Sequence, residues 1–69
     1  MKEPIKDRID VLLEKAKNND SYAQLQLAQC LKEGKWVEVS IEHAKYWAFK
    51  SVSNGCPGAE KFYKSLYNK

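Results

Sequence analysis

The side chains that could carry out chemistry in this chain are few and scattered. His43 is the single histidine, and no serine and aspartate stand at a spacing that would form a catalytic group with it. The aspartates and glutamates fall on predicted solvated faces, where carboxylates are poorly placed for general acid–base catalysis. We therefore expect no catalytic residue, and an enzyme is the least favoured class of function.

The same residues give no indication of a metal or cofactor site. Zinc requires about four ligands in close array, and Cys30, His43 and Cys56 have no recognisable zinc spacing. No glycine-rich stretch has the spacing of a phosphate-binding loop. We expect the protein to use neither a metal nor a cofactor.

The two cysteines are expected to remain thiols. In an antiparallel helical hairpin, Cys56 lies near the level of Ser21, and Cys30 is nine residues further along. At the helical rise per residue this separates them by about 13 Å, beyond the reach of a disulfide. Reduced cysteines, and an amino terminus without the apolar segment of a signal peptide, lead us to expect a cytoplasmic protein. No apolar run is long enough to cross a membrane.

The chain has 69 residues, enough for a single small domain, and its charge is unevenly distributed. Residues 1–34 hold six basic and six acidic side chains, whereas residues 35–69 hold six lysines and three glutamates, which gives the net charge of +3. This excess favours an acidic partner surface or nucleic acid. It falls short of the dense basic stripe of a dedicated nucleic-acid-binding protein.

Apolar residues recur at helical spacing in four segments. The first helix is predicted over residues 4–18, with Pro4 in its first turn. Its apolar stripe consists of Ile5, Ile9, Leu12, Leu13 and Ala16. A second, acidic stripe consists of Glu3, Asp7, Asp10 and Glu14. We interpret the acidic stripe as a solvated face, with a docking surface for a basic partner as the alternative.

Three further helices are predicted over residues 21–33, 41–54 and 58–67. Asp20 and Ser40 can cap the second and third helices, and Gly34 and Gly55 mark helix ends. The apolar stripe of the last helix consists of Ala59, Phe62, Tyr63, Leu66 and Tyr67. Because the loops are short, neighbouring helices should be antiparallel. The expected fold class is all-α, with four helices stacked as antiparallel hairpins.

The sequence also repeats itself. A shift of 36 residues superimposes Leu13 on Phe49, Asn18 on Asn54 and Ala23 on Ala59. A helical hairpin repeated at a period in the thirties is typical of an α-solenoid. One full unit spans about residues 23–58, and half-units flank it on both sides.

The repeat unit resembles the Sel-one-like repeats, which are related to the tetratricopeptide repeats. The matching residues are Ala23, Gln24, Leu27, Gly34, Val37, Ala44, Trp47, Lys50, Val52, Asn54 and Gly55. The resemblance implies an adaptor that binds a protein partner. The positions that we assign to packing and turns of the repeat are Ala23, Leu27, Ala28, Gly34, Ala44, Trp47, Gly55 and Ala59.

Departures from the family pattern provide the candidate functional residues. Trp36 replaces a turn glycine, and it is either a lid folded over the end of the hairpin or an anchor for a partner. Tyr46 and Phe49 occupy positions that are usually polar, and Ala48 replaces a usual aromatic residue. These two residues either repack the core around Ala48 or form an aromatic patch with the nearby Trp36. We expect Phe49 to repack the core and Tyr46 to be exposed.

The leading hypothesis is a non-catalytic module that binds a larger protein as an adaptor, regulator or inhibitor. Its proposed partner-binding residues are Lys35, Trp36, Lys45, Tyr46 and Lys50. The alternative is a nucleic-acid-binding regulator that uses Lys35, Lys45, Lys50, Lys61 and Lys64. A homodimer is compatible with both hypotheses.

Overall fold

The computed structural model describes residues 4–67, and their side chains from residue 9 onward. Within this range the chain forms four helices and no strand, which confirms the all-helical prediction. The helices are α1 (Pro4–Lys17), α2 (Ser21–Glu33), α3 (Ile41–Ser53) and α4 (Ala59–Ser65). Glu3, Ile5 and Asp7, which belong to the predicted stripes of the first helix, lie outside the described side chains.

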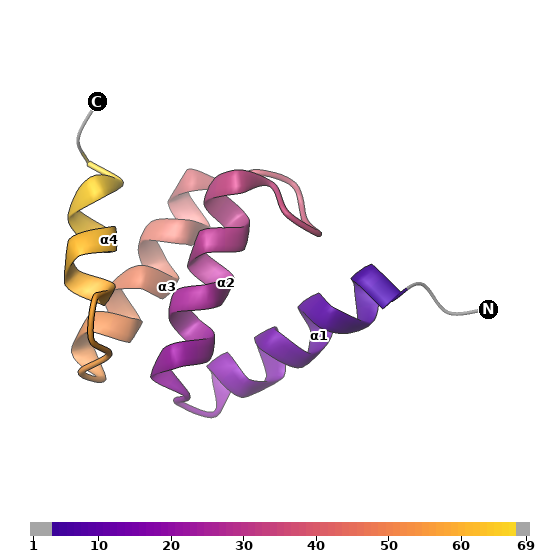
Figure 1. Cartoon of the computed structure of the whole chain (residues 1–69), viewed down its shortest axis with the longest axis horizontal. Helices are drawn as coiled ribbons and strands as arrows, with labels where there is room; N and C mark the ends of the chain where they lie inside the picture. Colours follow the sequence, from indigo (N-terminus) through magenta and orange to yellow (C-terminus); the bar gives the residue numbers. More distant parts are fainter. Residues whose placement is uncertain (1–3, 68–69) are drawn as a thin grey trace.

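The helices are arranged in a row in which each packs against its neighbour in the chain (Figure 1). The α2–α3 pair lies in the middle. Helix α1 meets α2 at the turn that joins them, and the amino-terminal end of α1 points away from α2 (Figure 1). The molecule measures 39 × 26 × 15 Å, so it is little thicker than one helix with its side chains. A row of this kind has no single centre, and its core is divided between pairs of helices.

Polar side chains and glycines define the helix ends. Asp20 Oδ1 accepts hydrogen bonds from the backbone N–H groups of Tyr22 (3.1 Å) and Ala23 (3.2 Å), and Ser40 Oγ accepts one from His43 N (3.4 Å). Both groups of bonds satisfy N–H donors that a helix leaves unpaired in its first turn. The predicted caps at Asp20 and Ser40 are therefore confirmed.

The last helix is shorter than the sequence predicted. After Ser65, the backbone N–H groups of Leu66 and Tyr67 bond to carbonyls three residues back, those of Tyr63 (3.1 Å) and Lys64 (3.0 Å). This tight turn replaces the final helical residues, so α4 ends at Ser65 instead of residue 67. Such tightening is common where a helix end has no capping residue.

The apolar core consists of two clusters. In the first cluster, side chains of α1, α2 and α3 pack around Ala16, Ala23 and Leu27. Partly buried residues complete it: Ile9, Leu12, Leu13, Leu31 and Trp47. The second cluster joins α2 to α4 and contains Leu25, Cys56 and Ala59, with Val52 and Phe62 against them. The described apolar residues predicted for α1 therefore all pack in the first cluster, although only Ala16 among them is fully buried.

A buried polar network connects three helices. The Gln24 side chain on α2 is fully buried; its Nε2 donates to the Ala16 carbonyl at the end of α1 (2.9 Å), and its Oε1 accepts from Asn54 Nδ2 (3.0 Å). Ser51 is also fully buried, and its Oγ donates to the Ser21 carbonyl (2.7 Å). Each bond joins helices that are adjacent in the row. The network therefore fixes the register of neighbouring helices as well as satisfying buried polar groups.

Gly34 and Gly55 allow a test of how the turns are stabilised. Both have left-handed backbones, with φ of 75° and 80°, but a Cβ on Gly34 would lie 2.7 Å from Val39 Cγ2, whereas one on Gly55 would meet nothing within 4 Å. We expect Gly55→Ala to lower the free energy of unfolding by about 1 kcal/mol through backbone strain alone. Gly34→Ala should cost about 0.5 kcal/mol more, because the exposed Val39 side chain must also move. Urea denaturation of both variants measures the difference, and equal costs would contradict the proposed contact.

Candidate functional site

The proposed partner-binding residues lie in two separate places. Lys45, Tyr46 and Lys50 are on α3, whereas Lys35 and Trp36 are on the connector between α2 and α3. The residues on α3 belong to a larger group with Phe49, Tyr63 of α4 and Tyr67, which follows the end of α4. We call this group the α3–α4 aromatic surface, and it consists of Lys45, Tyr46, Phe49, Lys50, Tyr63 and Tyr67.

The antiparallel packing of α3 and α4 pairs the residues of this surface. Phe49 faces Tyr63, with ring centroids 5.9 Å apart, and Lys45 Nζ lies 4.3 Å from the centroid of the Tyr67 ring. Residues four apart lie on the same face of a helix, so Lys45 and Phe49 meet Tyr67 and Tyr63 in reverse order. The two helices thereby form a continuous surface of rings flanked by a lysine.

Tyr46 extends the surface along α3. Its ring makes an edge contact with Trp47, with centroids 5.0 Å apart, and Lys50 Nζ lies 5.5 Å from its centroid. Tyr46 is 53% exposed, which confirms that it lies on the surface as predicted. Lys45 and Lys50 are half-buried against these rings, and each cation–π contact is worth about 0.5–1 kcal/mol at an exposed site.

The prediction that Phe49 repacks the core is wrong, because its side chain is 56% exposed. Ala44, Ala48 and Ser51 occupy the face of α3 that contacts α2, and all three are fully buried. Because α2 packs closely against this face, there is no space around Ala48 for the Phe49 side chain to fill. The next residue along a helix is rotated by about 100°, which directs Phe49 toward α4.

Tyr63 of α4 and Tyr67, just after this helix, belong to the apolar stripe predicted for the last helix, yet they form part of the surface. Tyr67 is 53% exposed because it follows the end of the helix, and its hydroxyl lies 3.1 Å from that of Tyr63. This hydrogen bond to Tyr67 raises the pKa of Tyr63. The phenol is therefore neutral near pH 7, and the charge of the surface comes from its lysines. In the sequence, Tyr63 and Tyr67 are four residues apart, as are Lys45 and Phe49. This equal spacing is the sequence signal for the pairing of the two helices.

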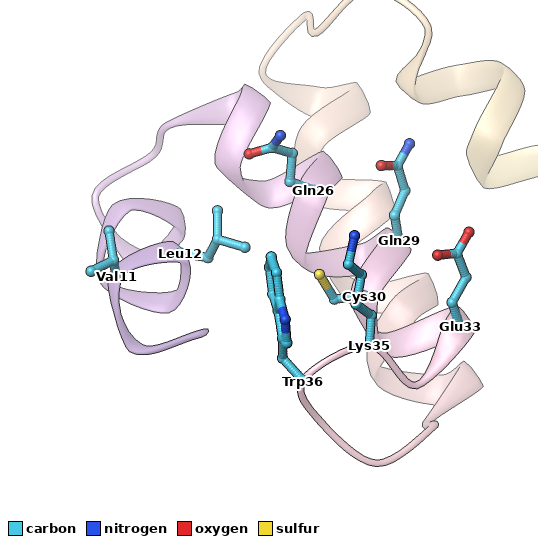
Figure 2. A pocket seen from close by; sticks show the side chains of 8 residues that line it. All are labelled: Val11, Leu12, Gln26, Gln29, Cys30, Glu33, Lys35 and Trp36. Carbon is cyan, nitrogen blue, oxygen red and sulfur yellow. The ribbon is translucent and has the colours of Figure 1, made fainter. Parts of the chain in front are cut away.

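Trp36 lies at the opposite side of the row of helices, between α1 and α2. Figure 2 shows its indole between Leu12 of α1 and Cys30 of α2, in the wedge that the divergence of α1 opens. A pocket of about 470 Å³ in this wedge is lined by residues that include Val11, Leu12, Cys30, Lys35 and Trp36. This position agrees with a lid over the hairpin end. A role for Trp36 in partner binding stays a prediction.

The backbone of Trp36 predicts an unusual response to mutation. Its φ of 69° is left-handed, a conformation that costs a residue with a side chain about 1–2 kcal/mol. Any variant that lacks the indole should lose its packing against α1, but only glycine also relieves the strain of the left-handed backbone. We therefore expect Trp36→Gly to be about 1 kcal/mol more stable than Trp36→Ala. Thermal denaturation followed by circular dichroism tests this order, and a more stable alanine variant would disprove the strain.

The lysines predicted for nucleic-acid binding do not form one stripe. Lys35 Nζ lies 5.0 Å from the centroid of the Trp36 ring, beside the pocket between α1 and α2. Lys64 on α4 pairs with Glu60, at 3.3 Å between Nζ and Oε2, and Lys61 is exposed on the same helix. The structure therefore brings Lys45 and Lys50 together with aromatic rings and leaves Lys35 on another side.

The other side chains that could take part in a reaction lie in surroundings that do not activate them. His43 Nδ1 lies 2.7 Å from Ser40 Oγ, but both residues belong to the exposed cap of α3, and no described carboxylate bonds to the imidazole. Burial raises the pKa of the Cys30 thiol, although Lys35 acts in the opposite direction, so a neutral and weakly nucleophilic form is favoured. Among the described side chains, from residue 9 to residue 67, no three of His, Cys, Asp or Glu form a group that could hold a metal ion.

Comparisons of the chain with known protein families, curated proteins and solved structures find no match. In the described part of the chain, no helix has both the length and the apolar character needed to cross a membrane.

Proposed function

We propose that this protein is a non-catalytic module that binds another protein through the α3–α4 aromatic surface. The observation that carries the proposal is the exposure of Tyr46 and Phe49 on α3 and of Tyr67 just after α4, each more than half accessible. Clustered exposed aromatic side chains are typical of interaction sites, because burying them against a partner releases much apolar surface from water. A small adaptor, regulator or inhibitor of a larger protein would use such a surface.

We further propose that the chain is built from Sel-one-like repeat units. The row of helices, in which each packs on its neighbour, supports this assignment. The residues expected to permit close packing, Ala23, Ala28 and Ala44, are all buried, and Gly34 and Gly55 have the left-handed backbones of turn residues. Proteins built in this way generally bind other proteins.

Nucleic-acid binding is the second candidate, because lysines lie beside aromatic rings. Single-stranded nucleic acids bind such surfaces when bases stack on open ring faces. Here the Tyr46 ring already contacts Lys50 and Trp47, and the Tyr67 ring contacts Lys45 and Tyr63. These neighbours reduce the area available for stacking. A protein partner therefore fits the surface better.

The test is affinity capture from cells of the native host with matched variants. Phe49→Ser and Tyr46→Ser should each lose a protein that the unmodified chain retains. Tyr22→Ser is the control, because Tyr22 is a 62% exposed tyrosine on α2, outside the surface. Circular dichroism should show that all three variants fold. If every captured protein is retained equally by the three variants, the α3–α4 aromatic surface is not the binding site.

A further inference from the structure

The charges around the α3–α4 aromatic surface restrict what can cover it. Helices α3 and α4 carry four lysines and two glutamates, a net charge of +2; these are Glu42, Lys45, Lys50, Glu60, Lys61 and Lys64. The Glu60 carboxylate is already paired with Lys64. Glu42 is the other carboxylate and is exposed one turn before Tyr46, but the lysines outnumber the carboxylates around the exposed rings.

Lys45 and Lys50 are held in place by the rings that they contact. Their ammonium groups lie 4.3 Å from the centroid of Tyr67 and 5.5 Å from that of Tyr46, and both lysine side chains are half-buried. A partner that covered the rings with apolar groups alone would remove water from two cations without compensating them. A basic partner would add repulsion, whereas carboxylates beside the apolar groups would pair with both lysines.

We infer that the α3–α4 aromatic surface binds an acidic protein segment that also carries leucine or aromatic side chains. The apolar side chains contact Phe49 and Tyr46, and flanking carboxylates pair with Lys45 and Lys50. This inference rests on the proposed function and adds the chemistry of the partner to it.

The probe is a short fluorescein-labelled peptide in which glutamates alternate with leucines and phenylalanines. Matched peptides carry glutamine or lysine in place of glutamate, and single-stranded oligothymidine represents nucleic acid. The glutamate peptide should bind at least about fivefold more tightly than the glutamine peptide, because two exposed ion pairs contribute roughly this much. Its binding should weaken as salt is raised, and amide shifts in ¹⁵N spectra should concentrate in α3 and α4.

Charge variants separate this inference from a general effect of net charge. The double variant Lys45→Gln/Lys50→Gln should lose the preference for glutamate, while Lys45→Arg/Lys50→Arg should keep it. Lys15→Gln/Lys17→Gln is the matched control, since it removes the same charge from exposed positions on α1. Equal binding of the glutamate and glutamine peptides, or tighter binding of oligothymidine, would overturn the inference.

The same variants distinguish failure of the inference from failure of the proposed function. Loss of a captured protein in both Phe49→Ser and Lys45→Gln/Lys50→Gln, but not in Lys15→Gln/Lys17→Gln, supports an acidic partner. Loss in Phe49→Ser alone keeps the protein-binding function and overturns the acidic chemistry. Retention in every variant overturns both.

Discussion

Replacement of Ala44 by leucine is expected to lower the free energy of unfolding by about 3 kcal/mol, the upper part of the usual range for overpacked cores. Ala44 is fully buried on the face of α3 that contacts α2. The Ser51 hydroxyl, on the same face, lies 2.7 Å from the Ser21 carbonyl of α2, so the two helices cannot separate without breaking this bond. A domain of this size has a total stability of roughly 3–10 kcal/mol, so such a loss would remove about a third or more of it. At the lower end of that range the variant would be largely unfolded.

Ser53→Leu is the matched control for Ala44→Leu. Ser53 is exposed at the end of the same helix, and a leucine there should change the free energy of unfolding by less than about 0.5 kcal/mol. Urea denaturation followed by circular dichroism measures both variants, and a low helical signal without denaturant is the expected extreme for Ala44→Leu. An unchanged denaturation midpoint for Ala44→Leu would show that α2 and α3 are not closely packed at this point.

Replacement of Gln24 by methionine should cost about 2 kcal/mol, the sum of two buried hydrogen bonds. Methionine keeps the length of the side chain but cannot donate to the Ala16 carbonyl or accept from Asn54 Nδ2. The Ala16 carbonyl would retain only its bond from Asn19 N (3.2 Å). Because Gln24 connects the ends of α1 and α3 to α2, we also expect α1 to separate from α2 and unfold locally more often.

Gln29→Met tests whether the effect comes from burial. Gln29 lies on α2 as well but is exposed, so its replacement should alter stability by less than about 0.5 kcal/mol. Chemical denaturation gives the stability of each variant, and hydrogen exchange of the α1 amides reports on the local opening. Equal stabilities of the two methionine variants would rule out a contribution from the network.

The helices could be predicted because their determinants are local. Each apolar stripe repeats within one helix, and the caps at Asp20 and Ser40 act on residues two or three positions away. Gly34 ends α2 through its own backbone conformation, with its N–H bonded to the Cys30 carbonyl (2.8 Å). The end of α4 was predicted less accurately, because no capping residue follows Ser65 to mark it.

The candidate site could be predicted only in part. The departure from the family pattern singled out Tyr46, and the basic carboxy-terminal half singled out Lys45 and Lys50. The structure places all three on α3, with each lysine against an aromatic ring. The sequence groups Lys35 and Trp36 with these residues, yet both line the pocket between α1 and α2, because the connector turns back over the wedge between these two helices. The path of a connector depends on contacts far away in the sequence, so periodicity does not reveal it.

By itself, the sequence determined that the chain is all-helical, where its helices begin and which alanines allow close packing, because these properties arise within single helices or from residue size. Only the tertiary structure decided that Phe49 is exposed, that Tyr63 and Tyr67 join it, and that Gln24 is fully buried. An apolar stripe shows that one face of a helix is covered but not how far a neighbour extends over its edges. The angles and distances between adjacent helices set that limit, and they depend on all the side chains at each interface.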